Sequence, residues 1–221
     1  MPTPLADKLE AVLGRPPSDL RPLSGGDIGT VTLAEFPGGD RLVVKQPGPG
    51  ETDTAEIEAR MLRHLRQVSD LPVPEVIHAE PGLLLIDYLD GTSGLEGAAE
   101  ADAGRYIARL HGVTDEAFGL EFDTVIGPLR QPNPRESDWL VFFRDHRLLQ
   151  MAQYAHRRGR LPQAVLGRIE RLAAQRLDSL VCSPDRPELV HGDLWGGNIL
   201  SKGGRIAGRE TELTGIMLNA L

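Results

Sequence analysis

The stretch that decides the fold lies near the C-terminal end, at residues 190–200, and reads Val-His-Gly-Asp-Leu-Trp-Gly-Gly-Asn-Ile-Leu. It places Asp193 and Asn198 five residues apart, between two short apolar runs. A carboxylate can accept a hydrogen bond from a hydroxyl group and orient it, and an amide oxygen is a neutral ligand for a hard cation. The same residues would also suit a glycine-rich turn closed by side-chain hydrogen bonds. The motif therefore needs support from the rest of the chain.

Support comes from Lys45, which ends an apolar run that we expect to be a strand over residues 41–45. Kinases share the His-x-Asp-x-x-x-x-Asn spacing and also need a strand Lys, held by a helix Glu, to contact the nucleotide phosphates. Glu58 fits this partner, because it shares one face of an expected helix with Leu62 and Leu65. In isolation, each residue could equally be an ordinary surface charge.

A glycine-rich segment precedes the first long strand and contains Gly25, Gly26 and Gly29. Glycines allow the backbone N–H groups to approach phosphates closely, although this spacing matches neither common phosphate-binding fingerprint and a plain β-turn would explain it. The order of the parts is more informative than any one of them. A glycine loop, Lys45, Glu58, an apolar hinge near residues 87–89 and the motif at 190–200 follow one another as a two-lobed kinase requires.

The periodicity of apolar residues divides the chain into a strand-rich first part and a helical second part. A capping box of Asp53 and Glu56 is expected to start the first helix, which reaches Val68. The other expected elements are strands at 30–36, 41–45, 75–78 and 83–88, and helices at 96–111, 139–158 and 162–180. We therefore expect an α+β, two-lobed, protein-kinase-like fold. Its small β-rich N-lobe would span residues 1–88, and its helical C-lobe 89–221 would carry the catalytic loop 190–200.

Composition limits the classes of partner. The 221 residues include 32 acidic and 24 basic side chains, so the net charge of −8 argues against a protein that binds nucleic acid or an anionic membrane. Only three of the basic residues are Lys, which makes Lys45 more notable. The single cysteine, Cys182, excludes an internal disulfide and fits a reducing cytoplasm. Neither a signal peptide nor a membrane-spanning run is recognisable in the sequence.

The chain resembles the fructosamine kinase (ketosamine-3-kinase) family, relatives of aminoglycoside and choline kinases. The resemblance runs from about residue 23 to about residue 208 and is most specific at His191–Asn198, where Trp195 follows Asp193 and Leu194. Shorter similarities lie at residues 108–112, 118–120, 126–129, 131–134 and 139–148.

This resemblance implies an ATP- and magnesium-dependent kinase that phosphorylates a sugar hydroxyl of a ketosamine, either a small molecule or a glycated lysine. It implies Asp193 as catalytic base, Asn198 as metal ligand, and Trp195 and His191 as substrate contacts. The nucleotide would contact the glycine loop, Lys45 with its partner Glu58, and the backbone of Asp87, Tyr88 and Leu89.

The sequence departs from the family pattern after the catalytic loop. Family members continue into an Ile-Asp-Pro segment whose Asp is the principal magnesium ligand, whereas Thr211 occupies that position here, between Glu210 and Glu212. The final helices of the C-lobe are also expected to be missing, which favours self-association through the incomplete lobe. Two alternatives therefore stay open: a nucleotide-binding but catalytically impaired form of the fold, or a kinase of aminoglycosides, choline or homoserine.

Overall fold

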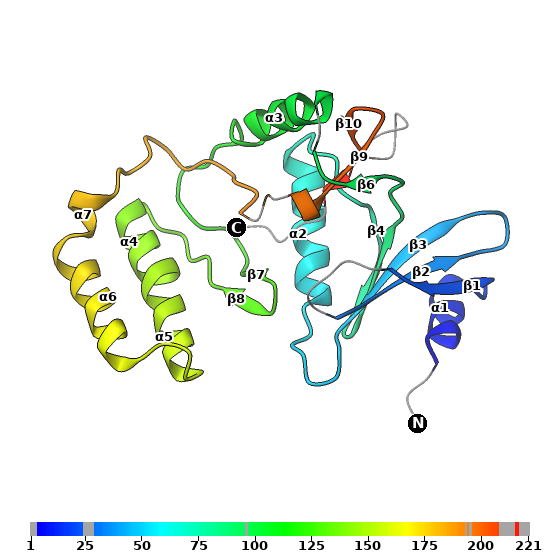
Figure 1. Ribbon diagram of the computed structural model, residues 1–221, viewed down its shortest axis with the longest axis horizontal. Coiled ribbons are helices and arrows are strands. Elements are labelled where there is room, and N and C mark those ends of the chain that lie inside the picture. Colours follow the sequence, from blue (N-terminus) through cyan, green and yellow to red (C-terminus); the bar gives the residue numbers. More distant parts are fainter. Residues whose placement is uncertain are drawn as a thin grey trace. The chain divides into compact units, whose positions relative to one another are not determined.

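The structure is a computed structural model that describes residues 4–23, 29–95, 97–192, 194, 196–207 and 215–216 (Figure 1). Its contacts divide the chain into two compact units. The first comprises Met1–Leu110, Val125–Leu129 and Val190–Leu221, and the second comprises His111–Thr124 and Arg130–Leu189. The first unit therefore contains both the strand-rich part and the segment of the catalytic loop. The expected lobe boundary at residue 88 stays a prediction.

The centre of the first unit is an antiparallel five-stranded sheet with the strand order β1-β2-β3-β5-β4. The strands are β1 (Asp19–Pro22), β2 (Thr30–Glu35), β3 (Arg41–Gln46), β4 (Val76–Glu80) and β5 (Leu83–Asp87). In the register of the central strands, Thr32 lies opposite Val44, and Val44 lies opposite Leu85. This face packs on helix α1 (Leu5–Leu13) through Leu9, in a core that also includes Ala34, Phe36, Leu42 and Leu83.

Alternation along β3 sends Val43 and Lys45 to the opposite face of the sheet from Val44. Helix α2 (Ala55–Val68) supplies the partner of Lys45, and it buries Met61, Leu62 and Leu65. Lys45 faces α2 because of the two-residue period of the strand, and Glu58 faces the sheet because of the helical period of α2. The two charges therefore meet although they are 13 positions apart.

A smaller sheet, also in the first unit, contains the strand that follows the catalytic loop. It is built from β6 (Thr92–Ser93), β9 (Ile199–Lys202), β10 (Arg205–Ile206) and β11 (Gly215–Ile216), with β9 pairing to each of the other three. Helix α3 (Ala98–Leu110) contacts β10, and the N–H of Ile206 donates to the carboxylate of Asp102 on α3 at 3.2 Å.

The second unit is mainly helical. Helix α4 (Trp139–Phe143) runs through a π-helical turn, η1 (Arg144–Leu149), into α5 (Gln150–Arg157), so one continuous helical run occupies the expected span. Helix α6 (Gln163–Gln175) and the short α7 (Leu177–Leu180) follow, and a hairpin of β7 (Thr124–Ile126) and β8 (Leu129–Gln131) precedes α4. Within the described ranges, none of the helices has the length and apolarity required to cross a bilayer.

The expected mixture of strands and helices is confirmed, but the expected capping box is wrong. The N-cap of α2 is Thr54, and its side chain makes no capping hydrogen bond. The carboxylate of Asp53 instead accepts from the N–H of Ala55 at 3.1 Å and from the N–H of Gly82 at 2.6 Å. Asp53 thus links the start of α2 to the turn between β4 and β5 through a long-range contact.

Gly29, immediately before β2, offers a test of the sheet geometry. Its φ is +78°, and an added Cβ would lie 2.5 Å from the carbonyl oxygen of Gln46 at the end of β3. Gly50 is a matched control, with a φ of +80° and nothing within 4 Å of an added Cβ. Both Gly→Ala changes carry the left-handed backbone cost, of about 1–2 kcal/mol.

Only the change at Gly29 adds a clash with a backbone atom. We expect Gly29→Ala to lower the free energy of unfolding by at least about 1 kcal/mol more than Gly50→Ala does. Urea denaturation of the two variants measures the difference. Equal losses of unfolding free energy in the two variants would show that the backbone around Gln46 can shift to accommodate the added Cβ at little cost.

Candidate active site

Lys45 and Glu58 form an ion pair that joins the sheet to α2. Both side chains are largely shielded from solvent, with 25% of the Lys45 side chain and 14% of the Glu58 side chain exposed. The other carboxylate oxygen of Glu58 accepts a hydrogen bond of 2.6 Å from the hydroxyl of Thr54, one helical turn earlier. The carboxylate is therefore fixed from two sides, and it presents the Lys45 ammonium in one defined position. The pairing expected from the sequence is present.

The glycine segment is described only in part. Gly25 and Gly26 lie outside the residues that the structure describes, whereas Gly29 stands at the start of β2, packed against the end of the strand that carries Lys45. A side chain at residue 29 would collide with that strand. The requirement for glycine at this position is therefore steric, and a phosphate contact of the segment stays a prediction.

The hinge segment leaves the sheet at the end of β5. Asp87 and Glu75 form a reciprocal pair: the N–H of Asp87 donates to the carbonyl of Glu75 at 3.0 Å, and the N–H of Glu75 donates to the Asp87 carboxylate at 2.5 Å. The N–H of Tyr88 donates to the carbonyl of Arg41 at 3.4 Å, and the Arg41 guanidinium lies over the Tyr88 ring at 4.2 Å. Backbone and side-chain contacts with neighbouring residues therefore hold this segment, whereas its expected contact with adenine stays a prediction.

Burial changes the acidity of the hinge carboxyl. Asp87 is only 7% exposed, and burial raises its pKa from 3.8 to about 6, against the smaller opposing effects of Arg66 and a backbone hydrogen bond. A carboxyl whose pKa is higher in the folded than in the unfolded chain favours folding when it is protonated. The free energy of unfolding should therefore fall as pH rises from about 4 to about 6, and this contribution should then level off.

Asp87→Asn tests this dependence, because the amide oxygen can still accept the hydrogen bond from Glu75 and the amide does not titrate. Relative to the original chain, the variant should gain up to about 3 kcal/mol of stability between about pH 4 and about pH 7.5. Urea denaturation of both proteins at the two pH values measures the change. A stability difference that is the same at both pH values would contradict the expectation.

The structure describes residues 190–200 except for Asp193 and Trp195. His191 is 2% exposed, Gly192 has a φ of +81°, and Asn198 ends the short 3₁₀ helix η2 (Gly196–Asn198), directly before β9. Asp193 and Trp195 lie outside the described residues. A buried His191 is better suited to holding the loop than to contacting a substrate, and its expected substrate contact stays a prediction.

Three contacts join the segment after the catalytic loop to the segment after the hinge. The ammonium of Lys202 pairs with the carboxylate of Asp90 at 2.9 Å, and this contact lowers the pKa of Asp90. The N–H of Gly94 donates to the carbonyl of Ile199 at 3.1 Å, and the hydroxyl of Ser201 donates to the carbonyl of Gly94 at 3.0 Å. These links fix β9, and with it the end of the catalytic loop, within the unit that holds Lys45 and Glu58.

The expected metal site has one candidate ligand in the described chain, the amide of Asn198. No cluster of three or more His, Cys, Asp or Glu side chains suited to a metal occurs among the residues searched, which are the described ones. Thr211, Glu210 and Glu212 lie outside them. The donor set therefore depends on Asn198 and on residues of the loop and tail whose arrangement is not described.

Sequence reasoning missed Thr54 and the Lys202–Asp90 pair. Thr54 could have been found, because it lies four residues before Glu58 and therefore on the same face of the first helical turn. The link between Lys202 and Asp90 could not, since 112 residues separate them and only the tertiary fold brings them together.

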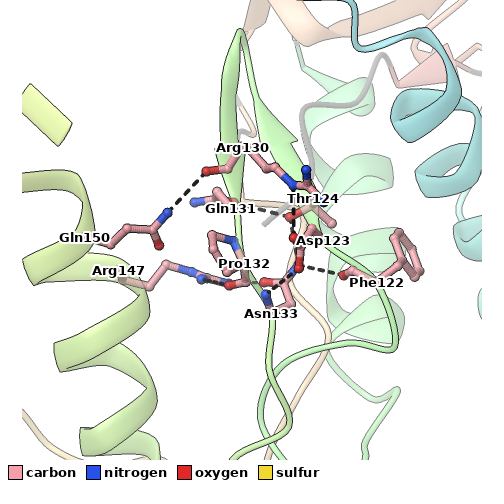
Figure 2. A network of polar contacts seen from close by, with 9 residues as sticks. All are labelled: Phe122, Asp123, Thr124, Arg130, Gln131, Pro132, Asn133, Arg147 and Gln150. Carbon is pink, nitrogen blue, oxygen red and sulfur yellow. Dashed lines mark hydrogen bonds and ion pairs between the residues drawn. The ribbon is translucent and has the colours of Figure 1, made fainter. Parts of the chain in front are cut away.

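A buried polar network in the second unit was also missed (Figure 2). The guanidinium of Arg147, on the π-helical turn, donates to the carbonyl of Pro132 at 2.9 Å and to the side-chain oxygen of Asn133 at 2.5 Å. The Asn133 amide in turn donates to the hydroxyl of Thr124 and to the carbonyl of Phe122, both at 3.0 Å. Burial lowers the pKa of Arg147 to about 10. Residues 131–134 and 139–148, two of the stretches that resemble the family, are thus in contact.

Comparison with known proteins shows which family shares these features. The fructosamine kinase family model matches residues 1–206. The chain belongs to the fructosamine kinase family. It is 30% identical over 199 residues to "Probable ketoamine kinase YniA" of Escherichia coli (strain K12), covering 86% of this chain and 66% of that protein. It is 29% identical to "Probable ketoamine kinase VV1_2562" of Vibrio vulnificus (strain CMCP6), covering 80% of this chain and 62% of that protein. The chain thus spans slightly less than two thirds of the length of these relatives.

Solved structures agree with this assignment. A crystal structure from Thermobifida fusca YX-ER1 that carries the name fructosamine-3-kinase superposes with a TM-score of 0.78 at 26% identity, covering 98% of this chain and 73% of that one. An aminoglycoside phosphotransferase, APH(4)-Ia, in complex with AMP-PNP and hygromycin B, superposes with a TM-score of 0.64 at 17% identity, covering 97% of this chain and 70% of that one. The protein-kinase-like α+β fold is confirmed.

Proposed function

We propose that the chain is an ATP-dependent kinase that transfers a phosphoryl group to a sugar hydroxyl of a ketosamine, of the fructosamine or ribulosamine type. The acceptor would be a small molecule or a glycated lysine. The observation that carries the proposal is the shielded Lys45–Glu58 pair, fixed by Thr54, in the same compact unit as the His191–Asn198 segment. Membership of the fructosamine kinase family supports the choice of acceptor.

Each residue has a defined task in this proposal. Lys45 contacts the nucleotide phosphates, Glu58 holds Lys45 in place, and the backbone of Asp87, Tyr88 and Leu89 accommodates adenine. Asp193 accepts a hydrogen bond from the acceptor hydroxyl and orients it for in-line attack on the γ-phosphorus. Bound magnesium supplies positive charge that offsets the charge developing on the phosphate oxygens. Asn198 would be one of its ligands, and Trp195 and His191 would contact the sugar.

A second candidate is a form of this fold that binds nucleotide but transfers phosphoryl groups poorly. Thr211 favours it, because a Thr at the position of the principal metal carboxylate carries no negative charge. Asn198 is also neutral, so the pair offers magnesium oxygen atoms without charge. The alternative acceptors are an aminoglycoside, choline or homoserine. The proposal also includes a cytoplasmic location and self-association of the chain.

The decisive experiment for the acceptor measures ATP consumption by the purified chain with fructoselysine, aminoglycosides or choline, each in the presence and absence of magnesium. Turnover only with fructoselysine and magnesium supports the ketosamine assignment. Turnover only with an aminoglycoside or choline would overturn it. Nucleotide binding without turnover on any acceptor would select the second candidate.

Lys45→Met tests the nucleotide site independently of turnover. The variant keeps a flexible chain of similar length but loses the ammonium, so we expect about tenfold weaker ATP binding by isothermal titration. Lys8→Met removes one of the other two lysines, on α1, and should leave the affinity unchanged. Equal affinity of both variants for ATP would exclude Lys45 as a phosphate contact.

A further inference from the structure

Six arginines lie between residues 157 and 176, on or beside α5 and α6. They are Arg157, Arg158, Arg160, Arg168, Arg171 and Arg176, and all are exposed. Within the described part of the chain, none of the six lies within 4 Å of a carboxylate oxygen. By the same criterion, eight other arginines are ion-paired: Arg15, Arg21, Arg105, Arg109, Arg130, Arg135, Arg144 and Arg186.

Residues 157–178 also contain only two acidic side chains, Glu170 and Asp178, so the segment carries an excess of four positive charges in a chain of net charge −8. Glu170 is two residues from Arg168 and one from Arg171, and neither spacing brings side chains together on a helix. The carboxylate of Asp178 accepts from the N–H of Ser179. The excess is therefore not neutralised locally.

Local helix stability does not explain the arrangement. Arg157 and Arg158 lie at the C-terminal end of α5, where cations are favourable. Arg160, however, is just ahead of the N-terminal end of α6, which has no acidic residue in its first turn and where a cation is unfavourable. Arg168 and Arg171 are three residues apart on α6, so their like charges repel each other.

An exposed apolar residue lies among these charges. Leu172 is 39% exposed and lies four residues after Arg168 on α6, so the two side chains share one ridge of this helix, next to Arg171. Leu166 and Ala173 are buried on the other side of this helix. Arginines beside an exposed apolar side chain are typical of surfaces that bind other proteins, whose contacts combine charge with an apolar anchor.

We propose that this arginine surface, defined by Arg168 and Arg171 beside Leu172 on α6, binds an acidic polypeptide segment that contains apolar residues. The guanidinium groups would form bidentate hydrogen bonds with the carboxylates of the segment, and Leu172 would pack on its apolar side chains. Nucleic acid is less well suited, because the exposed Leu172 offers nothing to a phosphate backbone and the net charge of the whole chain repels a long polyanion. The inference does not depend on the kinase activity proposed above.

The test uses the full chain and a fluorescein-labelled peptide of Glu-Glu-Leu repeats, with binding followed by fluorescence anisotropy. Arg168→Gln combined with Arg171→Gln should weaken binding about tenfold. The matched control combines Arg105→Gln with Arg109→Gln, which removes the same charge from α3, where both arginines are ion-paired. The control should change the affinity less than about twofold. Leu172→Ser and a Gln-Gln-Leu peptide should each weaken binding as well.

Three results would overturn the proposal. Equal losses of peptide affinity in the two double variants would show that only the net charge of the chain matters for binding. Tighter binding of single-stranded RNA than of the peptide, lost in the Arg168/Arg171 double variant, would assign the surface to nucleic acid. A dimer seen by light scattering that dissociates in that variant would assign it to a second copy of the chain. Circular dichroism of each variant checks that the helices remain folded.

Discussion

Replacing Thr211 by Asp should raise magnesium-dependent phosphoryl transfer roughly 10²–10³-fold above that of the original chain. Phosphoryl transfer depends mainly on positioning and on electrostatic stabilisation of the transition state, and losing one such contribution typically costs this much. Thr211 cannot supply the negative charge with which a carboxylate holds the metal, and Asn198 does not replace it. ATP turnover on fructoselysine, measured across a magnesium titration, gives the comparison.

Thr214→Asp is the matched control for this change, because it adds the same charge three residues further along the chain. It should leave turnover close to that of the original protein. Full activity of the unmodified chain would contradict the expectation, and would show that Glu210 or Glu212 binds the metal instead.

Asp193→Asn, made in the Thr211→Asp protein, should lower kcat roughly 10²–10⁴-fold and leave the affinity for ATP nearly unchanged. An amide at this position can still contact the acceptor, but it cannot take up the proton of the attacking hydroxyl. Single-turnover kinetics measures the transfer step, and isothermal titration with ATP measures binding.

Asp185→Asn, in the exposed loop before the catalytic segment, is the control and should alter neither quantity. A parallel loss of ATP affinity and turnover in Asp193→Asn would identify Asp193 as a nucleotide contact or a structural residue. Together with the Thr211 series, this separates the residue that orients the acceptor from the residues that hold the metal.

The pairing of Lys45 with Glu58 could be predicted from the sequence because two simple periodicities determine it. Alternation along the strand places Lys45 on one face of the sheet. Helical spacing places Glu58 on the same helix face as Leu62 and Leu65, so the two charges can meet only between the sheet and the helix. The strands β2, β3 and β5 were predictable because each is a short, mainly apolar run rich in Val, Leu, Ile or Thr.

Other features depend on contacts that are distant in the sequence. The capping box at Asp53 was a sound local expectation, but the carboxylate also bonds to Gly82 in another turn. Strand β1 is short and mostly exposed, so its sequence has little apolar periodicity, and it forms by pairing with β2. The network around Arg147 could not be predicted because carbonyl and amide oxygens hold this partly buried arginine, and no acidic residue in the sequence points to them.

The pairing of Thr92 with Ser201 affects the order in which parts of the chain fold during synthesis. The two residues are 109 positions apart, and the whole of the second unit lies between them in the sequence. As the chain leaves the ribosome, the five-stranded sheet with its Lys45–Glu58 pair is complete long before β9 exists. Contacts of such high sequence separation form late and slowly. The nascent chain should therefore form the five-stranded sheet first, and the smaller sheet should form only after residues 199–202 have emerged and paired.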